Sequence, residues 1–126
     1  MNNDVKKRLN QIKVEDYIWI VYTGIIALSL YANRLERKYF IVKDEKSKNE
    51  YRNIMIVIFL ILYLVYSYFL KDSWDDFKNI NNIKDKKKKE LITLSFIGSL
   101  LIFISGAIFL YIAIVDENID VELAFN

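Results

Sequence analysis

The chain has 126 residues, enough for one domain, and it contains no histidine, cysteine or proline. The absence of histidine removes the usual general base near neutral pH, and the absence of cysteine removes thiolate nucleophiles, disulfides and thiolate metal sites. We therefore expect neither a metal nor a cofactor. Apolar residues make up 54% of the chain and charged residues 27%, a combination that arises because the charges lie between long uncharged runs. The abundance of Ile, Lys and Asn suggests an AT-rich genome, and on composition alone we expect a bacterial one.

A short basic lead, residues 1–16, precedes the first uncharged run. Its apolar residues Val5, Leu9 and Ile12 follow the i, i+4, i+7 spacing of a helix, with basic residues between them. This pattern predicts one or two turns of amphipathic helix lying on a membrane surface. A frayed terminus is the alternative interpretation.

Three runs without charge cover residues 17–33, 53–70 and 91–115. Each run is apolar on every side of a helix, whereas a soluble helix keeps a polar face. Their lengths match the roughly 17 to 25 residues that cross the hydrocarbon core of a bilayer. The sequence therefore predicts one all-α domain, residues 1–126, that is an integral membrane protein with three transmembrane helices. A cleaved signal peptide is an alternative for the first run, although acidic residues precede it and no A-x-A site follows it.

The first charged loop, residues 34–52, begins with a continuation of the helical pattern. Leu35, Tyr39 and Val42 keep the i, i+4, i+7 spacing, so we expect the helix to extend past the end of the span. Residues 43–50 are expected to form the turn, although neither Gly nor Pro marks its boundaries.

The second charged loop, residues 71–90, contains two local signals. Ser73 and Asp76 resemble a capping box, which predicts the start of a short separate helix at the membrane surface. A cluster of asparagines at positions 79, 81 and 82 predicts a turn after it. From Lys84 to Val115 nothing breaks a helix, so one long helix is expected there.

Aromatic and basic residues predict the orientation. Trp19 and Trp74 stand at the same side of a three-span bundle, where they would anchor the membrane interface. The lead holds four Lys and Arg residues and the second loop seven, eleven together, against seven in the first loop and none after residue 115. The positive-inside rule then predicts a plasma-membrane protein with a cytoplasmic N-terminus and an external C-terminus. The first span considered alone favours the reverse orientation, because seven basic residues follow it and four precede it.

The lysine-rich end of the second loop is expected to lie near lipid head groups. Its lysines are Lys84, Lys86, Lys87, Lys88 and Lys89. Lysines beside an anionic leaflet are each attracted by about 1 kcal/mol. Five acids in the same loop reduce its net charge to +2, so we interpret it as a topology determinant and solubilising linker. No nucleic acid is expected as a partner, because the loop has no arginine and few aromatic residues.

Acidic residues in the second loop allow one catalytic alternative. Asp72, Asp75 and Asp76 form a D-x-x-D-D motif. Closely spaced carboxylates can hold Mg²⁺ against a diphosphate substrate, which would make the protein a small enzyme of the membrane surface. Such a site needs a second acidic cluster, and Glu15 with Asp16 is the one predicted to lie on the same side. We favour structural acids at helix ends and assign no catalytic residue.

Small residues form a face on the third predicted span. Four of them lie within about 40° on a helical wheel, and two more widen the face to roughly 120°. The face consists of Ser95, Gly98, Ser99, Ser105, Gly106 and Ala113. Small residues let helix backbones approach closely, so the face predicts either packing on the first span or docking of another protein or another copy. The second span has almost no small residues and is expected to face more lipid.

These features predict a non-catalytic membrane protein that acts through helix–helix contacts, as an accessory, regulatory or immunity-type partner. Its expected partners are the lipid bilayer and another membrane protein or itself. An oligomeric, holin-like pore lined by Ser95, Ser99 and Ser105 is the alternative. No span contains an ionisable residue other than tyrosine, which argues against an ion pathway or a proton relay.

Overall fold

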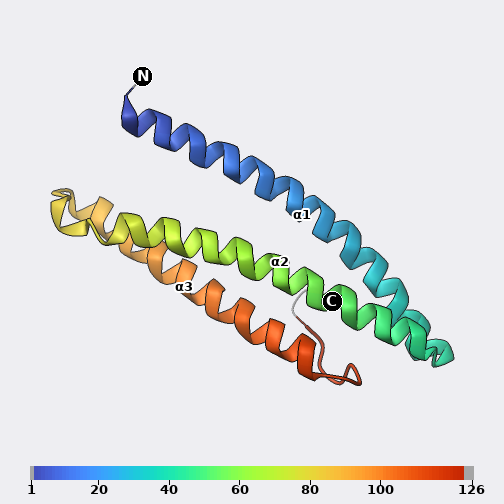
Figure 1. Ribbon diagram of the computed structural model, residues 1–126. Helices are drawn as coiled ribbons and strands as arrows, with labels where there is room; N and C mark the ends of the chain where they lie inside the picture. Colours follow the sequence, from blue (N-terminus) through green and yellow to red (C-terminus); the bar gives the residue numbers. More distant parts are fainter. Residues whose placement is uncertain (1, 124–126) are drawn as a thin grey trace.

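The computed structural model describes residues 2–123, and over this range the chain forms three long α-helices. They are α1 (Asn3–Val42), α2 (Glu45–Phe77) and α3 (Lys86–Val115), with a short 3₁₀ turn, Ile80–Asn82, before α3 (Figure 1). Each helix is long and apolar enough to cross a membrane. The all-helical architecture with three candidate spans is therefore confirmed. Residues 1 and 124–126 of the predicted domain lie outside the described residues.

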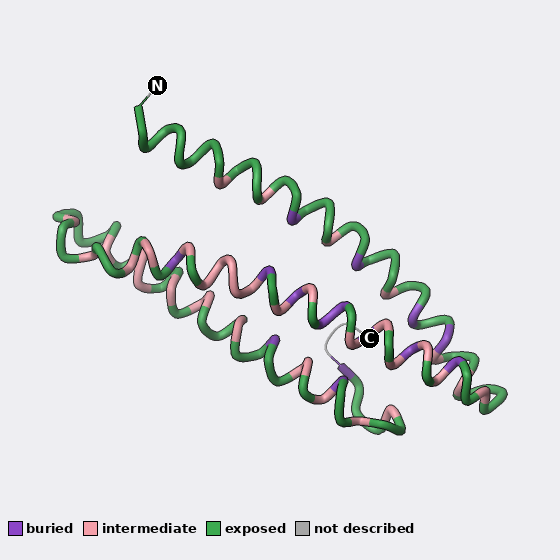
Figure 2. Tube along the Cα trace, viewed as in Figure 1, coloured by how far each residue is buried: buried purple, intermediate pink, exposed green. Residues whose placement is uncertain are grey.

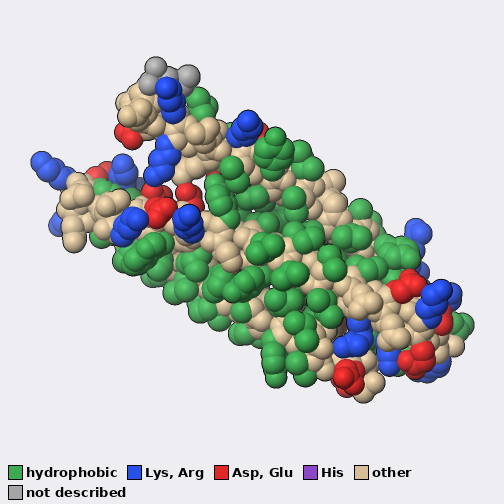
Figure 3. All heavy atoms as spheres, in the orientation of Figure 1, with side chains coloured by type: hydrophobic (Ala, Val, Ile, Leu, Met, Phe, Trp, Pro, Cys, Tyr) green, Lys and Arg blue, Asp and Glu red, His purple; other side chains and the backbone are tan. Residues whose placement is uncertain are grey.

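The helices are longer than the uncharged runs that predicted them. At 1.5 Å per residue, the 40 residues of α1 extend about 60 Å, and the 30 residues of α3 about 45 Å, whereas a hydrocarbon core is about 30 Å thick. The additional turns carry charge, and Figure 3 shows the blue and red side chains gathered toward the two ends of the molecule. The basic lead belongs to α1, which begins at Asn3. The side chain of Asn2 caps it by accepting a 3.0 Å hydrogen bond from the Asp4 N–H.

The turn between α1 and α2 consists of two residues, Lys43 and Asp44, so the prediction of a turn spread over residues 43–50 is too long. Lys43 takes the left-handed conformation with φ 57°, and its N–H donates to the Tyr39 carbonyl at 2.8 Å. The Ser47 hydroxyl donates to Asp44 Oδ2 at 2.7 Å, and the Lys38 ammonium lies 3.4 Å from the same oxygen. The Ser47 bond and Lys38 lower the pKa of the Asp44 carboxyl. The predicted extension of the first helix to Val42 is confirmed.

The prediction of a separate helix starting at Ser73 is wrong, because α2 continues through this residue to Phe77. The Ser73 hydroxyl donates to the Leu70 carbonyl at 3.1 Å within the same helix instead of capping a new one. The predicted turn at the asparagines is confirmed by the 3₁₀ turn that follows α2. The long third helix begins at Lys86, and the Asp85 carboxylate caps it by accepting from the Lys87 N–H at 3.0 Å.

The second helix is the central one, so the expectation that it faces more lipid than the other two is wrong. Both α1 and α3 pack against α2, whereas α1 and α3 have few contacts with each other. The buried residues concentrate along α2, as Figure 2 shows in purple. Those of α2 are Ser47, Tyr51, Met55, Ile58, Phe59, Leu62, Val65 and Ser73. Most of these side chains are large, so α2 packs against its neighbours through bulky apolar side chains rather than through small residues.

The third helix packs on α2 and not on α1, which corrects the predicted contact between the first and third spans. The two helices approach closely at Gly106, where an added Cβ atom would lie 2.7 Å from Cδ2 of Tyr66. Ala113, about two turns further along the same face of α3, is also buried and belongs to the core cluster. Aromatic pairs fill the rest of this contact, with ring centroids 5.8 Å apart for Phe59 and Phe109 and 4.9 Å apart for Tyr63 and Phe103.

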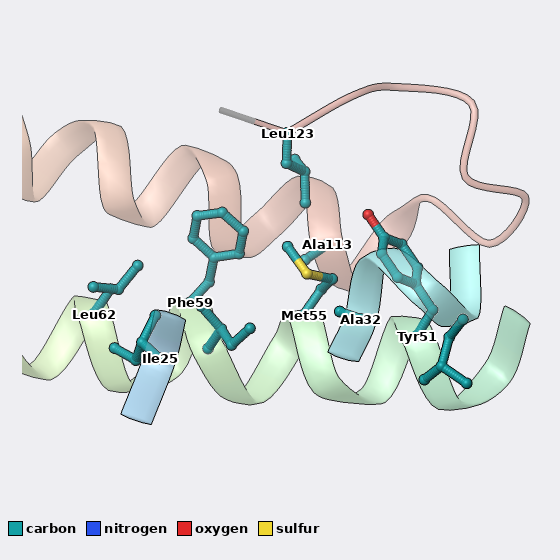
Figure 4. Close-up of a cluster of buried hydrophobic side chains, with 10 residues drawn as sticks. Ile25, Ala32, Tyr51, Met55, Phe59, Leu62, Ala113 and Leu123 are labelled. Atoms are coloured by element: carbon teal, nitrogen blue, oxygen red, sulfur yellow. The ribbon is translucent and has the colours of Figure 1, made fainter. Parts of the chain in front are cut away.

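The segment after α3 folds back onto the core. Leu123 is only 6% exposed and belongs to the same hydrophobic cluster as Tyr51, Met55 and Ala113, as Figure 4 shows. The Arg52 guanidinium of α2 donates to the carbonyls of Ile114 at 3.1 Å and Asp116 at 3.2 Å, which satisfies acceptors at the end of α3. This cation also complements the negative end of the helix dipole.

The carboxylate of Asp116 holds the folded-back segment. Its two oxygens accept from the N–H groups of Asp120 at 3.0 Å and Val121 at 2.8 Å. Although partial burial works against ionisation, these backbone hydrogen bonds leave the pKa of Asp116 below its usual range. A lowered pKa means that the interaction stabilises the fold at neutral pH and is lost as the pH falls through the folded-state pKa.

Substitution of Gly106 tests the contact between α2 and α3. We expect Gly106→Leu to lower the melting temperature in detergent by several degrees, since overpacking typically costs about 1–3 kcal/mol. Gly106→Ala should give a smaller drop. Gly98→Leu is the matched control, because a Cβ at Gly98 would meet nothing within 4 Å. Equal melting temperatures for the Gly106→Leu and Gly98→Leu proteins would contradict this packing.

Substitution of Asp116 tests the folded-back segment. In Asp116→Asn the backbone bonds lose their charged acceptor, so the amides of Asp120 and Val121 should exchange with deuterium several-fold faster at neutral pH. In the parent protein, the protection of these amides relative to their intrinsic exchange rate should fall in the same way on acidification below the ordinary aspartate pKa of about 3.9. Glu117→Gln, at an exposed neighbouring position, should leave both amides unchanged. Uniform protection in all three proteins would refute the role of Asp116.

Candidate functional site

A cavity lies between the helices at the end that carries the N-terminal turns of α1 and the loop before α3. Its volume is about 330 Å³, and all three helices line it. We call it the polar cavity, because its wall contains three carboxylates, two tyrosines and three serines. These residues are Glu15 and Tyr22 of α1; Tyr66, Asp72, Ser73 and Asp76 of α2; and Ser95 and Ser99 of α3. Phe69 and Ile102 supply its apolar part.

A hydrogen bond between α1 and α2 closes the acidic side of the polar cavity. The Gln11 amide donates from Nε2 to Asp72 Oδ1 at 2.7 Å. Arg8 lies one turn away, with its guanidinium 3.5 Å from Oε1 of Glu15. Burial, the largest effect, raises the pKa of the Asp72 carboxyl, which lies beyond the uncharged run 53–70. The negative charges of Asp76 and Glu15 raise it further, whereas the Gln11 bond and the positive charge of Lys7 lower it. Because Asp76 and Glu15 repel the ionised form of Asp72, a cation placed among these three carboxylates would be attracted to them.

The D-x-x-D-D motif is divided by the helix that carries it. Asp72 and Asp76, four residues apart on α2, line the polar cavity, whereas the Asp75 carboxylate pairs with Lys78 at 3.2 Å. Of the predicted second cluster, Glu15 lines the cavity and Asp16 is exposed outside it. Within residues 2–123, no group of three acidic side chains is arranged to hold a metal ion.

The predicted small-residue face of α3 is divided between three environments. Gly106 and Ala113 are buried in the chain's own core. Ser95 and Ser99 line the polar cavity. Ser105 is exposed, and Gly98 has open space where a side chain would be. Sequence periodicity alone did not separate these roles, because the position of α2 decides which part of the face is covered.

An apolar groove between α1 and α2 adjoins the polar cavity. Its volume is about 480 Å³, and it shares Tyr22 and Tyr66 with that cavity. The rest of its lining is mainly apolar, from Trp19, Ile25, Ile26, Leu30 and Leu62, with Ser29 and Asn33 among them. Sequence reasoning missed this groove, because it depends on how α1 and α2 are aligned.

The predicted interface anchors and lysines differ in their surroundings. Trp19 is 68% exposed, whereas Trp74 is 47% exposed and packs edge-on against Phe96 of α3 with ring centroids 5.5 Å apart. Lys84, Lys86, Lys87 and Lys88 are exposed and Lys89 is half-buried. Lys88 also lines a smaller cavity of about 180 Å³, which shares Ser73, Asp76 and Ser95 with the polar cavity.

Comparison with known proteins assigns no role to these residues. No protein-family model matches the sequence, and neither a curated protein nor a solved structure is significantly similar to it. The candidate site is therefore defined by its own geometry.

A double-mutant cycle tests the bond that joins α1 to α2 at the polar cavity. We expect Gln11→Ala and Asp72→Ala to be coupled in unfolding free energy by about 1 kcal/mol, the typical size of a partly exposed hydrogen bond to a charged group. Gln11→Ala with Asp75→Ala is the control cycle, and its coupling should be near zero because Asp75 faces Lys78. Equal coupling in both cycles would show that the Gln11–Asp72 bond is not formed in solution.

Proposed function

We propose that the protein is a multi-pass integral membrane protein of the bacterial plasma membrane. The proposal is supported by three helices of sufficient length and apolarity and by the many large apolar side chains that the chain leaves exposed along them. Such extensive apolar surface is unfavourable in water but matches the hydrocarbon core of a bilayer. Charged turns at both ends of the molecule support the same location.

The proposed orientation has a cytoplasmic N-terminus and an external C-terminus. The start of α1 and the loop between α2 and α3 lie at one end of the molecule, and the α1–α2 turn and the end of α3 at the other (Figure 1). The first end carries eleven Lys and Arg residues and the second seven, so the positive-inside rule favours the cytoplasm for the first.

Cysteine labelling tests this orientation, since the chain has no cysteine of its own. In intact cells, a membrane-impermeant thiol reagent should label Asn118→Cys, and it should label Lys87→Cys only after permeabilisation. Both positions are exposed, so access depends on the membrane and not on burial. Labelling of Lys87→Cys alone would reverse the orientation, and immediate labelling of both would argue against three spans.

The proposed activity is non-catalytic contact with another membrane protein, in an accessory, regulatory or immunity-type role. The observation that carries it is that two of the three glycines are not used by the chain's own packing. A Cβ added at Gly24 or Gly98 would meet nothing within 4 Å, whereas Gly106 is filled by Tyr66. Thr23 and Ala27, beside Gly24, are exposed as well. Small residues on the outside of membrane helices allow a partner helix to approach closely.

The two alternatives receive less support from the geometry. For an oligomeric pore, Ser95 and Ser99 would need to form a common lining with Ser105, but only the first two line the polar cavity. For an enzyme using the acidic motif, only Asp72 and Asp76 share a cavity, and Asp75 is paired with Lys78.

Affinity purification in mild detergent tests the proposed activity. We expect a stoichiometric second membrane protein that is lost in Gly24→Leu or Gly98→Leu while the melting temperature of the chain stays unchanged. Gly106→Leu serves as a contrast, because it should destabilise the chain itself. Retention of the partner in both outer-glycine variants would reject the proposed contact surface. A homo-oligomer without a second protein would favour the pore and make bilayer conductance the next measurement.

A further inference from the structure

We propose that the polar cavity and the apolar groove together bind one membrane lipid with a primary-amine head group. The ammonium would lie among Glu15, Asp72 and Asp76, and a hydrocarbon chain would lie along α1 and α2 past Trp19 and Ile26. This inference rests on the proposed membrane location, and it adds a ligand that the proposed partner contact does not require.

The shape of the two spaces fits a slender, amphiphilic ligand. They adjoin at Tyr22 and Tyr66, and their volumes of about 330 and 480 Å³ lie within the range of small-molecule sites, roughly 300–1,000 Å³. From Glu15 to Leu30 the path along α1 is about 22 Å, close to half of the roughly 40–45 Å thickness of a bilayer. One lipid of a single leaflet has this length.

The surface proposed for a partner helix lies elsewhere on the molecule. The outer glycines, Gly24 and Gly98, line neither the polar cavity nor the apolar groove. The lipid site and the proposed partner surface are therefore different parts of the molecule.

Charge selects the head group. The wall of the polar cavity holds three carboxylates, and the negative charges of Asp76 and Glu15 act on Asp72, so a cation is favoured among them. A primary ammonium offers three N–H donors to these acceptors, whereas a trimethylated amine offers none. Three basic groups stand nearby: Arg8 pairs with Glu15, the charge of Lys7 acts on Asp72, and Lys88 lines the adjoining cavity next to Asp76. They suit the phosphate of a zwitterionic lipid, while a purely anionic head group would face the carboxylates.

Native mass spectrometry of the purified full-length chain tests the lipid site. Phosphatidylethanolamine, phosphatidylcholine and phosphatidylglycerol with identical chains are added separately in detergent. We expect one phosphatidylethanolamine per chain, bound roughly tenfold more tightly than the other two, which corresponds to one charge-assisted hydrogen bond. Equal retention of the three lipids would overturn the proposal.

Matched variants separate the site from general adhesion of lipid. Asp76→Asn and Asp72→Asn should each lose most of the preference for phosphatidylethanolamine, and Asp75→Asn, from the same motif, should keep it. Ser29→Trp should block the groove, whereas Ala27→Trp, at an exposed position outside both spaces, should not. Equal effects of Asp75→Asn and Asp76→Asn would overturn the proposal even if lipid binds.

Two further measurements distinguish a failure of the lipid site from a failure of the proposed function. Membrane fractionation reports on the location, and loss of the partner in Gly24→Leu reports on the contact surface. A chain found in membranes that binds its partner but shows no preference among lipids would refute the lipid site alone.

Discussion

Gly106 lets α3 approach α2 so closely that the ring of Tyr66 lies against its backbone. The Tyr66 ring takes part in two features of the structure. On the side of α3 it packs against Gly106, and on the side of α1 it lines both the polar cavity and the apolar groove. The α2–α3 contact and the candidate site therefore depend on the same residues. Because Gly106 has no side chain, the Tyr66 ring can occupy the position in which it lines the site.

Much of the fold could be predicted from the distribution of charge. The uncharged runs identified the three helices, and the spacing of Leu35, Tyr39 and Val42 identified the extension of the first. The order of packing could not be predicted in this way, because the tendency of small residues to meet each other pointed to α1 and α3. In the structure a glycine of α3 receives a large ring of α2 instead, and this choice depends on the alignment of both helices. The turn was predicted at residues 43–50 but not its tightness, because at its start a lysine takes the left-handed conformation that usually favours glycine.

The candidate site was predicted only in part, for a similar reason. Asp72 and Asp76 are four residues apart, so their common helix face can be read from the sequence, and the separation of Asp75 follows from the same spacing. The approach of Glu15 to this pair depends on the antiparallel alignment of α1 with α2, which a two-residue turn fixes 28 residues away. Lys88 reaches the same region only because the chain turns back at the asparagines. Local spacing can group residues within one helix, whereas contacts between helices require the tertiary structure.

The short turn at Lys43 and Asp44 is the point about which α1 would rotate relative to α2. The helix extends about 60 Å from this point, so a rotation of about 6° at the turn would move its far end by about 6 Å. The Gln11–Asp72 bond lies near that far end, so it opposes such a rotation more strongly than a similar bond close to the turn would. A modest force on the basic lead, such as attraction to a charged surface, would thus change the width of the space between α1 and α3 far more than it would change any contact near the turn.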